Sequence, residues 1–196
     1  MKSYPSIFND CLSPVTPGPS SSNTAGPYRL GAMASDLLVG KPVHLHGEMS
    51  KKGGYFATFY GMHSDKAFLL GIMKKDLRSY NFNNIYADAD AHGLSYTYEF
   101  SDNVPNRPSE SAWLTLSSEV GDTIFVKTAS LGGGEIYIDE LDGIKTYIDG
   151  KYFYLLVRVA ANFLPSIKNM LPGTYSVADS SSGESLITVR SSTPID

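Results

Sequence analysis

The chain is poor in cysteine, with only Cys11 in 196 residues. An intramolecular disulfide, a cysteine zinc site and a self-contained iron–sulfur cluster each need several thiolates, so this chain alone holds none of them. The sequence also lacks a basic-then-apolar leader and any apolar run of membrane-spanning length. We therefore expect a soluble, cytoplasmic protein with no membrane partner.

Charge is also scarce. Charged residues make up 18% of the chain and the formal net charge is −4, whereas nucleic-acid binders normally carry a basic face. We therefore expect no nucleic-acid partner. The 42% of hydrophobic residues is enough for a buried core, and the length fits one domain or one domain with a small appendage. The 13 tyrosines and 9 phenylalanines favour an additional surface buried against a partner.

An amphipathic helix is expected after the irregular, proline-containing residues 1–24. Pro27 begins the pattern and Gly40 ends it. The apolar residues recur at helical spacing: Leu30, Met33, Ala34, Leu37 and Leu38. Residues 42–48 then alternate apolar and polar side chains, which predicts a half-buried strand.

Further along, the glycine-bounded segment 53–61 predicts a loop or short turn. Ser64 and Asp65 predict the cap of a second helix, and residues 84–91 predict a short helix ended by Gly93. Asp142-Gly143 predicts a tight hairpin turn. Strands are expected at 94–100, 112–117, 123–131, 135–141 and 144–149.

The tail after residue 150 forms a separate pattern. Residues 152–159 predict a buried strand, 162–171 a short helix, and 174–191 a hairpin that turns at 180–183. This gives an α+β chain with mostly antiparallel strands, divided into residues 1–150 and an appendage at 151–196.

Hydroxyl groups are concentrated just before the first helix, in GPSSSNTAG at residues 18–26. A helix start offers free N–H donors and the positive end of the dipole, so a carboxylate or phosphate would fit there. The alternative is that one of these residues caps the helix while the others face water.

Two glycine-containing motifs are further candidates. In GMHSD, residues 61–65, His63 beside Asp65 is a reasonable general base, or else a surface histidine near a helix cap. In SLGGGE, Gly132–Gly134 require positive φ or are approached closely by a backbone, a ligand or a partner chain. His44 and His46 share a strand face, but two histidines are too few to predict a metal site.

Taken in order, these motifs resemble the small β part of bacterial iron–sulfur L-serine dehydratases. The resemblance runs from about Ser6 to Gly150 and depends above all on GPSSSNTAG followed by SLGGGEIYIDELDG. It implies an α+β domain of the serine dehydratase β type (alternate substrate binding-like). It also implies an α subunit that carries a four-iron–four-sulfur cluster, where water is eliminated from L-serine or a related β-hydroxy amino acid to give a 2-oxo acid and ammonia.

The resemblance also implies roles for individual residues. His63 and Asp65 would be catalytic, and a group of polar and glycine residues would bind the small amino-acid substrate: Ser20, Ser21, Ser22, Asn23, Thr24, Asn106, Gly132, Gly133 and Gly134. The tail would be a truncated ACT-like βαββ element that serves packing or homodimerisation.

Three histidine positions of the family pattern differ here. Asn23 stands where SSSHTAG has histidine, Met62 where GHGTD has histidine, and Val104 where HPNT has histidine. Asparagine forms hydrogen bonds but does not transfer protons near neutral pH, and methionine does neither. Two interpretations follow. The complex is a lyase that uses His63 or the α partner as its base, with L-serine or a changed substrate, or the chain is a structural or regulatory subunit.

Overall fold

The structure, a computed structural model, describes residues 19–195 apart from 80, 169, 172–174 and 181–182. Cys11 and most of the segment that we expect to be irregular lie outside the described residues. The described part is α+β, as predicted. It contains one mixed six-stranded sheet and one smaller antiparallel sheet of three strands.

The main sheet has the strand order β2-β1-β3-β4-β5-β6. Its strands are β1 (Pro42–Ser50), β2 (Ser95–Ser101), β3 (Glu110–Ser118), β4 (Thr123–Gly132), β5 (Glu135–Leu141) and β6 (Ile144–Ile148). Only β1 and β2 pair in parallel, which requires a long crossover between them. All other pairs are antiparallel, so the prediction of a mostly antiparallel sheet is confirmed.

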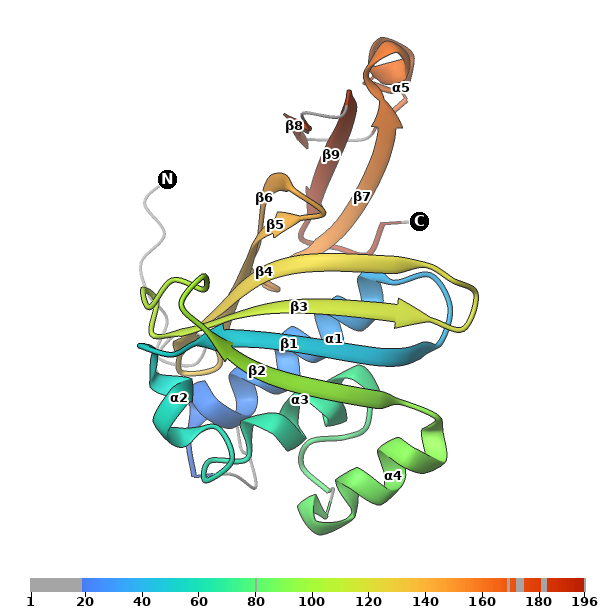
Figure 1. Ribbon diagram of the computed structural model, residues 1–196. Helices are drawn as coiled ribbons and strands as arrows, with labels where there is room; N and C mark the ends of the chain where they lie inside the picture. Colours follow the sequence, from blue (N-terminus) through green and yellow to red (C-terminus); the bar gives the residue numbers. More distant parts are fainter. Residues whose placement is uncertain (1–18, 80, 169, 172–174, 181–182, 196) are drawn as a thin grey trace.

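The helices cover one face of this sheet (Figure 1). A π-helical turn, η2 (Ser21–Ala25), leads directly into α1 (Gly26–Leu37). The crossover from β1 to β2 contains α2 (Gly54–Thr58), α3 (Ser64–Ile72), the 3₁₀ turn η3 (Phe82–Asn84) and α4 (Ile85–His92). The core lies between the helices and the sheet, and its fully buried strand residues include Leu45, Met49, Leu114, Leu116, Val126 and Ile138.

Helices α1 and α3 approach each other closely because glycines face the contact from both sides. A Cβ atom at Gly31 would lie 2.5 Å from the carbonyl oxygen of Phe68, and one at Gly71 would lie 2.0 Å from that of Tyr28. No larger residue fits either position without moving a helix. This packing fixes the C-terminal half of α3 against α1.

Two predictions for the crossover are wrong. The segment 53–61 is not simply a loop, because Tyr55 and Phe59, four residues apart, are both buried and form the inner face of α2 and its C-terminal end. Ser64 and Asp65 do not cap α3 from outside; they are its first residues, and the N-cap residue is His63 in the left-handed conformation with φ of 61°. The hydroxyl of Ser64 bonds instead to the backbone carbonyl of Asn23.

The tail forms the second sheet, in the order β7-β9-β8, and extends away from the main sheet beyond β6 (Figure 1). Its elements are β7 (Phe153–Ala160), η4 (Ala161–Phe163), α5 (Leu164–Lys168), β8 (Tyr175–Asp179) and β9 (Glu184–Ser191), which confirms the strand–helix–strand–strand order. The expectation that β7 is buried is wrong, because β7 is an edge strand and β9 is the central one. Leu186 on β9 joins the main core, and the domain boundary at residue 150 stays a prediction.

Candidate functional site

The sheet topology brings the motif segments to one end of the molecule. Ser50 at the end of β1 pairs with Ser101 at the end of β2, and Glu110 at the start of β3 pairs with Ser130 near the end of β4. The connections that follow β1, β2 and β4 therefore leave the sheet at the same end. The first turn of α1 lies there too, since a Cβ atom at Gly26 would be 2.1 Å from Ser130 Oγ. We call this region the motif end.

Ser20 caps the helix, as one of the two sequence alternatives anticipates. Its side-chain oxygen accepts a hydrogen bond from the backbone N–H of Asn23 at 3.2 Å. The other residues of the segment do not simply face water, because Asn23 is 7% exposed and Thr24 is fully buried. The segment is thus a helix start that is packed into the protein rather than a flexible linker.

Asn23 joins the first motif to the second. Its side-chain oxygen accepts a hydrogen bond from the hydroxyl of Thr58 at 2.8 Å. Its backbone carbonyl accepts one from the hydroxyl of Ser64 at 2.7 Å. Its side-chain nitrogen donates to the oxygens of Ser20 and Ser22 at 3.3 Å and 3.2 Å. The amide therefore holds the serines of GPSSSNTAG in place and ties them to α2 and α3.

Two further hydrogen bonds complete the connection of the three motifs. The hydroxyl of Thr24 donates to the backbone carbonyl of Met62 at 3.1 Å. The backbone N–H of Gly133 donates to the hydroxyl oxygen of Ser21 at 3.1 Å. Residues 20–24, 61–65 and 132–134, far apart in the sequence, thus form one hydrogen-bonded region.

The three glycines adopt the backbone conformation that the sequence predicts. Gly132, Gly133 and Gly134 have φ angles of 92°, 63° and 82°, which side chains with a Cβ atom rarely allow. Among the described residues, nothing lies within 4 Å of a Cβ atom built on Gly132 or Gly133, so conformation rather than crowding explains these two. The carbonyl of Gly134 accepts from Arg29 on α1 at 2.6 Å, which fixes the turn from the other side.

His63 and Asp65 lie close in sequence but face different partners. The ring of His63 is partly buried, with its centroid 5.8 Å from that of Phe82. Asp65 is 2% exposed; its Oδ2 accepts a hydrogen bond from the hydroxyl of Tyr86, and its backbone carbonyl accepts one from Tyr98 at 2.8 Å. Within the described structure no hydrogen bond joins His63 to Asp65, so the anticipated pair has no direct contact.

The two tyrosines remain neutral donors. Burial first, and then the hydrogen bond to Asp65, raises the pKa of Tyr86 well above its usual value. Burial and the nearby charge of Asp65 likewise raise the pKa of Tyr98. Both hydroxyls therefore keep their protons at any physiological pH, and the Asp65 carboxylate keeps its donor.

Asn106 is at the motif end but is not connected to the other motifs. It is exposed in the loop of residues 102–109, in which Val104 is buried. The loop is joined to α2 through the backbone N–H of Gly54, which donates to the carbonyl of Ser109 at 2.8 Å. Among the described contacts, none links the side chain of Asn106 to residues 20–24 or 61–65.

Three buried side-chain oxygens in the described residues have no hydrogen-bond partner: Tyr55 Oη, Asp65 Oδ1 and Ser130 Oγ. All three belong to segments that form the motif end. An unpaired buried polar atom is costly, so a native structure that keeps one calls for an explanation such as a catalytic role or a bound water or ion. The sequence patterns did not single out Tyr55, Tyr86, Tyr98 or Ser130 as functional residues. Of these four, only Ser130 lies in one of the three motifs, as the serine of SLGGGE.

The polar groups of the motif end suit an anion better than a metal cluster. They are hydroxyls, one amide and backbone N–H groups at a helix start, whereas an iron–sulfur cluster is held by several thiolates. Among the residues that the structure covers, no three His, Cys, Asp or Glu side chains gather at one place. His44 and His46 bond to Ser95 and Thr97 on the open face of the sheet.

A groove of about 810 Å³ lies away from the motif end. It lies between the tail and the main body, lined by the C-terminal half of α1, the start of β4 and strand β7. The described helices include none with both the length and the apolar character needed to span a bilayer.

Comparison with known proteins assigns the family. A scan against models of protein families finds no match. The probable L-serine dehydratase beta chain of Bacillus subtilis (strain 168) is 33% identical over 154 residues, 79% of this chain and 68% of that protein. The chain belongs to the L-serine dehydratase beta chain family. A second member, the L-serine dehydratase beta chain of Peptoniphilus asaccharolyticus, is 26% identical over 149 residues, 76% of this chain and 66% of that relative.

Membership of this family confirms the resemblance seen in the motifs. The chain spans about two thirds of the length of both family members. The name "beta chain" in both relatives implies a two-subunit enzyme with an alpha partner.

Proposed function

We propose that the chain is the β subunit of an iron–sulfur L-serine dehydratase-like ammonia-lyase. The complex eliminates water from L-serine or a related β-hydroxy amino acid and gives a 2-oxo acid and ammonia. The hydrogen-bonded connection of residues 20–24, 61–65 and 132–134 at one end of the sheet is the observation that supports this proposal.

The start of η2, which leads into α1, is the proposed carboxylate-binding element. The first N–H groups of a helix have no partner within the helix and carry the positive end of its dipole. The hydroxyls of Ser21 and Ser22 stand beside these groups, held by Gly133 and Asn23. A substrate carboxylate would therefore meet several donors that are already in place before it binds.

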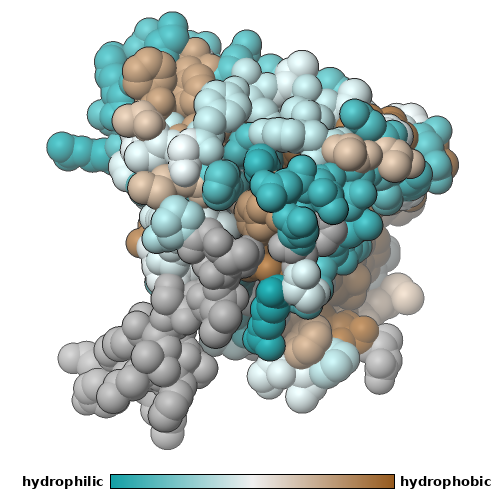
Figure 2. Space-filling model, turned by 90° about the horizontal axis from the view of Figure 1, so that it is seen from below, coloured by the Kyte–Doolittle hydropathy of each residue, from teal (hydrophilic) through white to brown (hydrophobic). Residues whose placement is uncertain are grey.

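The site is proposed to be completed by the α partner. Three exposed apolar residues lie within or next to the motif segments: Phe56, Tyr60 and Leu131 are 57%, 60% and 50% exposed. Seen from below, the surface mixes hydrophilic areas with separate hydrophobic patches (Figure 2). Since this chain has one cysteine, the four-iron–four-sulfur cluster would be on the partner, where it would activate the substrate hydroxyl.

The proton-transfer role falls to His63 or to the partner. Asn23 is hydrogen-bonded within the protein to Ser20, Ser22, Thr58 and Ser64 and has no proton to exchange near neutral pH. His63 precedes α3 and bears the only imidazole of the connected motifs. In this proposal it takes the α-proton of the substrate, while residues 20–24 hold the carboxylate.

A second candidate is a structural or regulatory subunit without catalytic residues. The observation that favours it is the internal use of Asn23, whose polar atoms are bonded to Ser20, Ser22, Thr58 and Ser64. An amide with this set of partners stabilises the fold whether or not a reaction takes place. His63 would then be replaceable.

The test is co-expression with the α chain, anaerobic cluster reconstitution and assay of 2-oxo acid formation from L-serine and related β-hydroxy amino acids. We expect His63→Ala to lower kcat by two orders of magnitude or more, and His44→Ala on the open sheet face to leave it unchanged. A cluster-loaded complex that is inactive on all of these substrates would contradict the lyase. An active complex with a fully active His63→Ala variant would place the base on the partner.

A further inference from the structure

Asp65 has a partner that no motif includes. Its side chain lies in the first turn of α3, and Tyr86 reaches it from the first turn of α4, 21 residues further along the chain. The hydroxyl of Tyr86 donates to Asp65 Oδ2. The sequence pairs Asp65 with His63, whereas the structure pairs it with Tyr86.

The ring of Tyr86 is itself held in place. It stacks on Tyr96 with a centroid distance of 5.8 Å and an interplanar angle of 16°, and Lys66 Nζ lies 5.3 Å from its centroid. Tyr98 on β2 donates to the backbone carbonyl of Asp65 at 2.8 Å. Both the side chain and the backbone of Asp65 are thus fixed by tyrosine hydroxyls.

The other carboxylate oxygen has no such partner. Asp65 is 2% exposed, and its Oδ1 is buried without a hydrogen bond. A carboxylate accepts hydrogen bonds and donates none, so an oxygen left in this way requires a donor from outside the described residues. A β-hydroxy amino acid has two such donors, its ammonium group and its hydroxyl.

We propose that Tyr86 is the positioning residue of Asp65: it fixes Oδ2 so that Oδ1 receives a donor group of the substrate. The inference rests on the proposed function and replaces the His63–Asp65 pair with a division of roles. His63 handles the proton, and Asp65, oriented by Tyr86, binds the substrate. Tyr86 touches no substrate itself.

The test uses three variants of the full chain in the reconstituted complex. Tyr86→Phe removes one hydroxyl, Asp65→Asn removes the charge, and Tyr96→Phe is the matched control, since it removes a hydroxyl from the same aromatic stack without touching Asp65. We expect Tyr86→Phe to lower kcat/KM by about tenfold to a hundredfold, Asp65→Asn to lower it further, and Tyr96→Phe to stay near the wild type.

The outcomes separate this inference from the proposed function. The activity of the wild-type complex tests the proposed function. The ratio of the kcat/KM values of Tyr86→Phe and Tyr96→Phe tests the positioning role of Tyr86. Equal kcat/KM values of these two folded variants would overturn the positioning role.

A readout that needs no activity is NMR of the isolated full chain with ¹³Cζ-labelled tyrosine. The Tyr86 signal, assigned by its absence in Tyr86→Phe, should shift in Asp65→Asn, while that of Tyr154, which bonds to Asp149, should not. A Tyr86 signal indifferent to Asp65→Asn would remove the contact on which the inference depends.

Discussion

The side-chain oxygen of Asn23 and the hydroxyl of Thr58 lie 2.8 Å apart, although 35 residues separate them in the chain. The same hydroxyl is also within hydrogen-bond distance of the carbonyl of Gly54, so one proton is shared between two acceptors. The contact joins the helix start that would bind a carboxylate to the first helix of the crossover. It is one of the hydrogen bonds by which Asn23 holds the motif end together.

Replacing Asn23 by alanine should therefore destabilise the chain. Asn23→Ala removes the side-chain acceptor of the Thr58 and Ser64 hydroxyls and one donor each from Ser20 and Ser22. Loss of buried hydrogen bonds of this kind costs about 1–3 kcal/mol, and a chain of this size loses roughly 2–4 °C in Tm for each kcal/mol. Thermal unfolding measures the change.

The matched control is Asn103→Ala, because Asn103 is exposed in the loop between β2 and β3. Its Tm should stay within about 1 °C of the wild type, as is usual for surface substitutions. Equal Tm values for the two alanine variants would mean that the Asn23 bonds do not contribute to folding.

Gly26 should not tolerate even alanine. Its missing Cβ atom would lie 2.1 Å from Ser130 Oγ and 2.7 Å from Ser130 Cβ, so Gly26→Ala pushes α1 away from β4. Overpacking of this kind costs about 1–3 kcal/mol. Gly61→Ala is the control, since its Cβ atom would have no neighbour closer than 3.8 Å.

The double variant Gly26→Ala/Ser130→Gly tests whether the contact with Ser130 causes the loss of stability. Ser130→Gly removes both of the atoms that Gly26→Ala would meet, so the double variant should recover most of the loss seen in urea unfolding. Purely additive effects of the two substitutions would show that the contact with Ser130 is not responsible. Ser130 Oγ has no hydrogen-bond partner among the described residues, so Ser130→Ala alone should not reduce stability.

Local patterns in the sequence were enough to predict most of the helices and strands. The stripe that includes Leu30 and Ala34 predicts α1, and the turn at Asp142-Gly143 is confirmed by φ angles of 49° and 81° at its two residues. The segment 53–61 was misjudged because its glycines suggested a loop, whereas the burial of Tyr55 and Phe59 against the core decides in favour of a helix. Burial against distant residues is not visible in a local pattern.

In the candidate site, too, local features could be predicted from the sequence and distant contacts could not. The motifs containing Ser21, Asp65 and Gly133 were found from sequence, because hydroxyls at a helix start and glycines in a turn have local causes. The partners were not: Tyr86 belongs to no motif, and its contact with Asp65 depends on how α4 packs against α3. The link from Gly133 to Ser21 spans 112 residues and follows only from the strand order.

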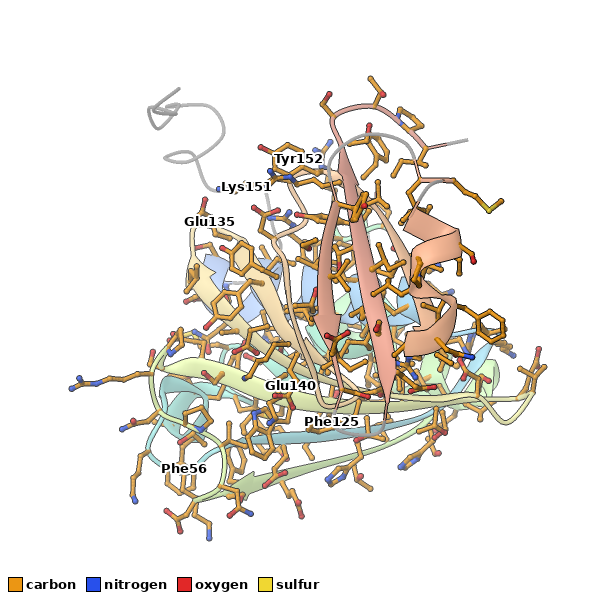
Figure 3. All side chains as sticks on the ribbon, turned by 90° about the horizontal axis from the view of Figure 1, so that it is seen from above. Phe56, Phe125, Glu135, Glu140, Lys151 and Tyr152 are labelled. Carbon is orange, nitrogen blue, oxygen red and sulfur yellow. The ribbon has the colours of Figure 1, made fainter. Side chains whose placement is uncertain are left out.

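Glu140 should make stability depend on pH. Burial alone would raise the pKa of this carboxyl, but ion pairs with Lys127 at 2.7 Å and Lys145 at 3.2 Å outweigh burial and lower it. Because the pKa is lower in the folded state, the stabilisation is present above the unfolded value near 4.5 and is lost as the pH falls through the folded value. Glu140, labelled in Figure 3, lies on β5, next to the edge strand β6 of the main sheet.

Glu140→Gln should thus lower the urea midpoint at pH 7, and the difference from the wild type should shrink as the pH falls below about 4. Asp139→Asn, one residue away, is the control for a change of charge on the same strand. A difference between Glu140→Gln and the wild type that stays constant from pH 7 to pH 3 would contradict the assignment.

Arg29 connects the glycine turn to the start of the tail. Its guanidinium donates to the carbonyl of Gly134 at 2.6 Å and to that of Gly150 at 3.2 Å. Next to it, Lys151 Nζ and Glu135 form an ion pair at 2.6 Å, and Figure 3 shows these two side chains near each other. The junction between the main sheet and the tail is therefore held to the same turn that contacts Ser21.

Arg29→Gln should loosen both ends of this connection, because the shorter amide does not reach two carbonyls at once. We expect faster amide hydrogen exchange at residues 132–135 and 150–154, and little change in β1 or β3, which have no contact with the guanidinium. Arg78→Gln is the control, since Arg78 is exposed and its side chain takes no part in the motif end. Exchange that rises at residues 150–154 alone would show that Arg29 anchors the tail without holding the glycine turn.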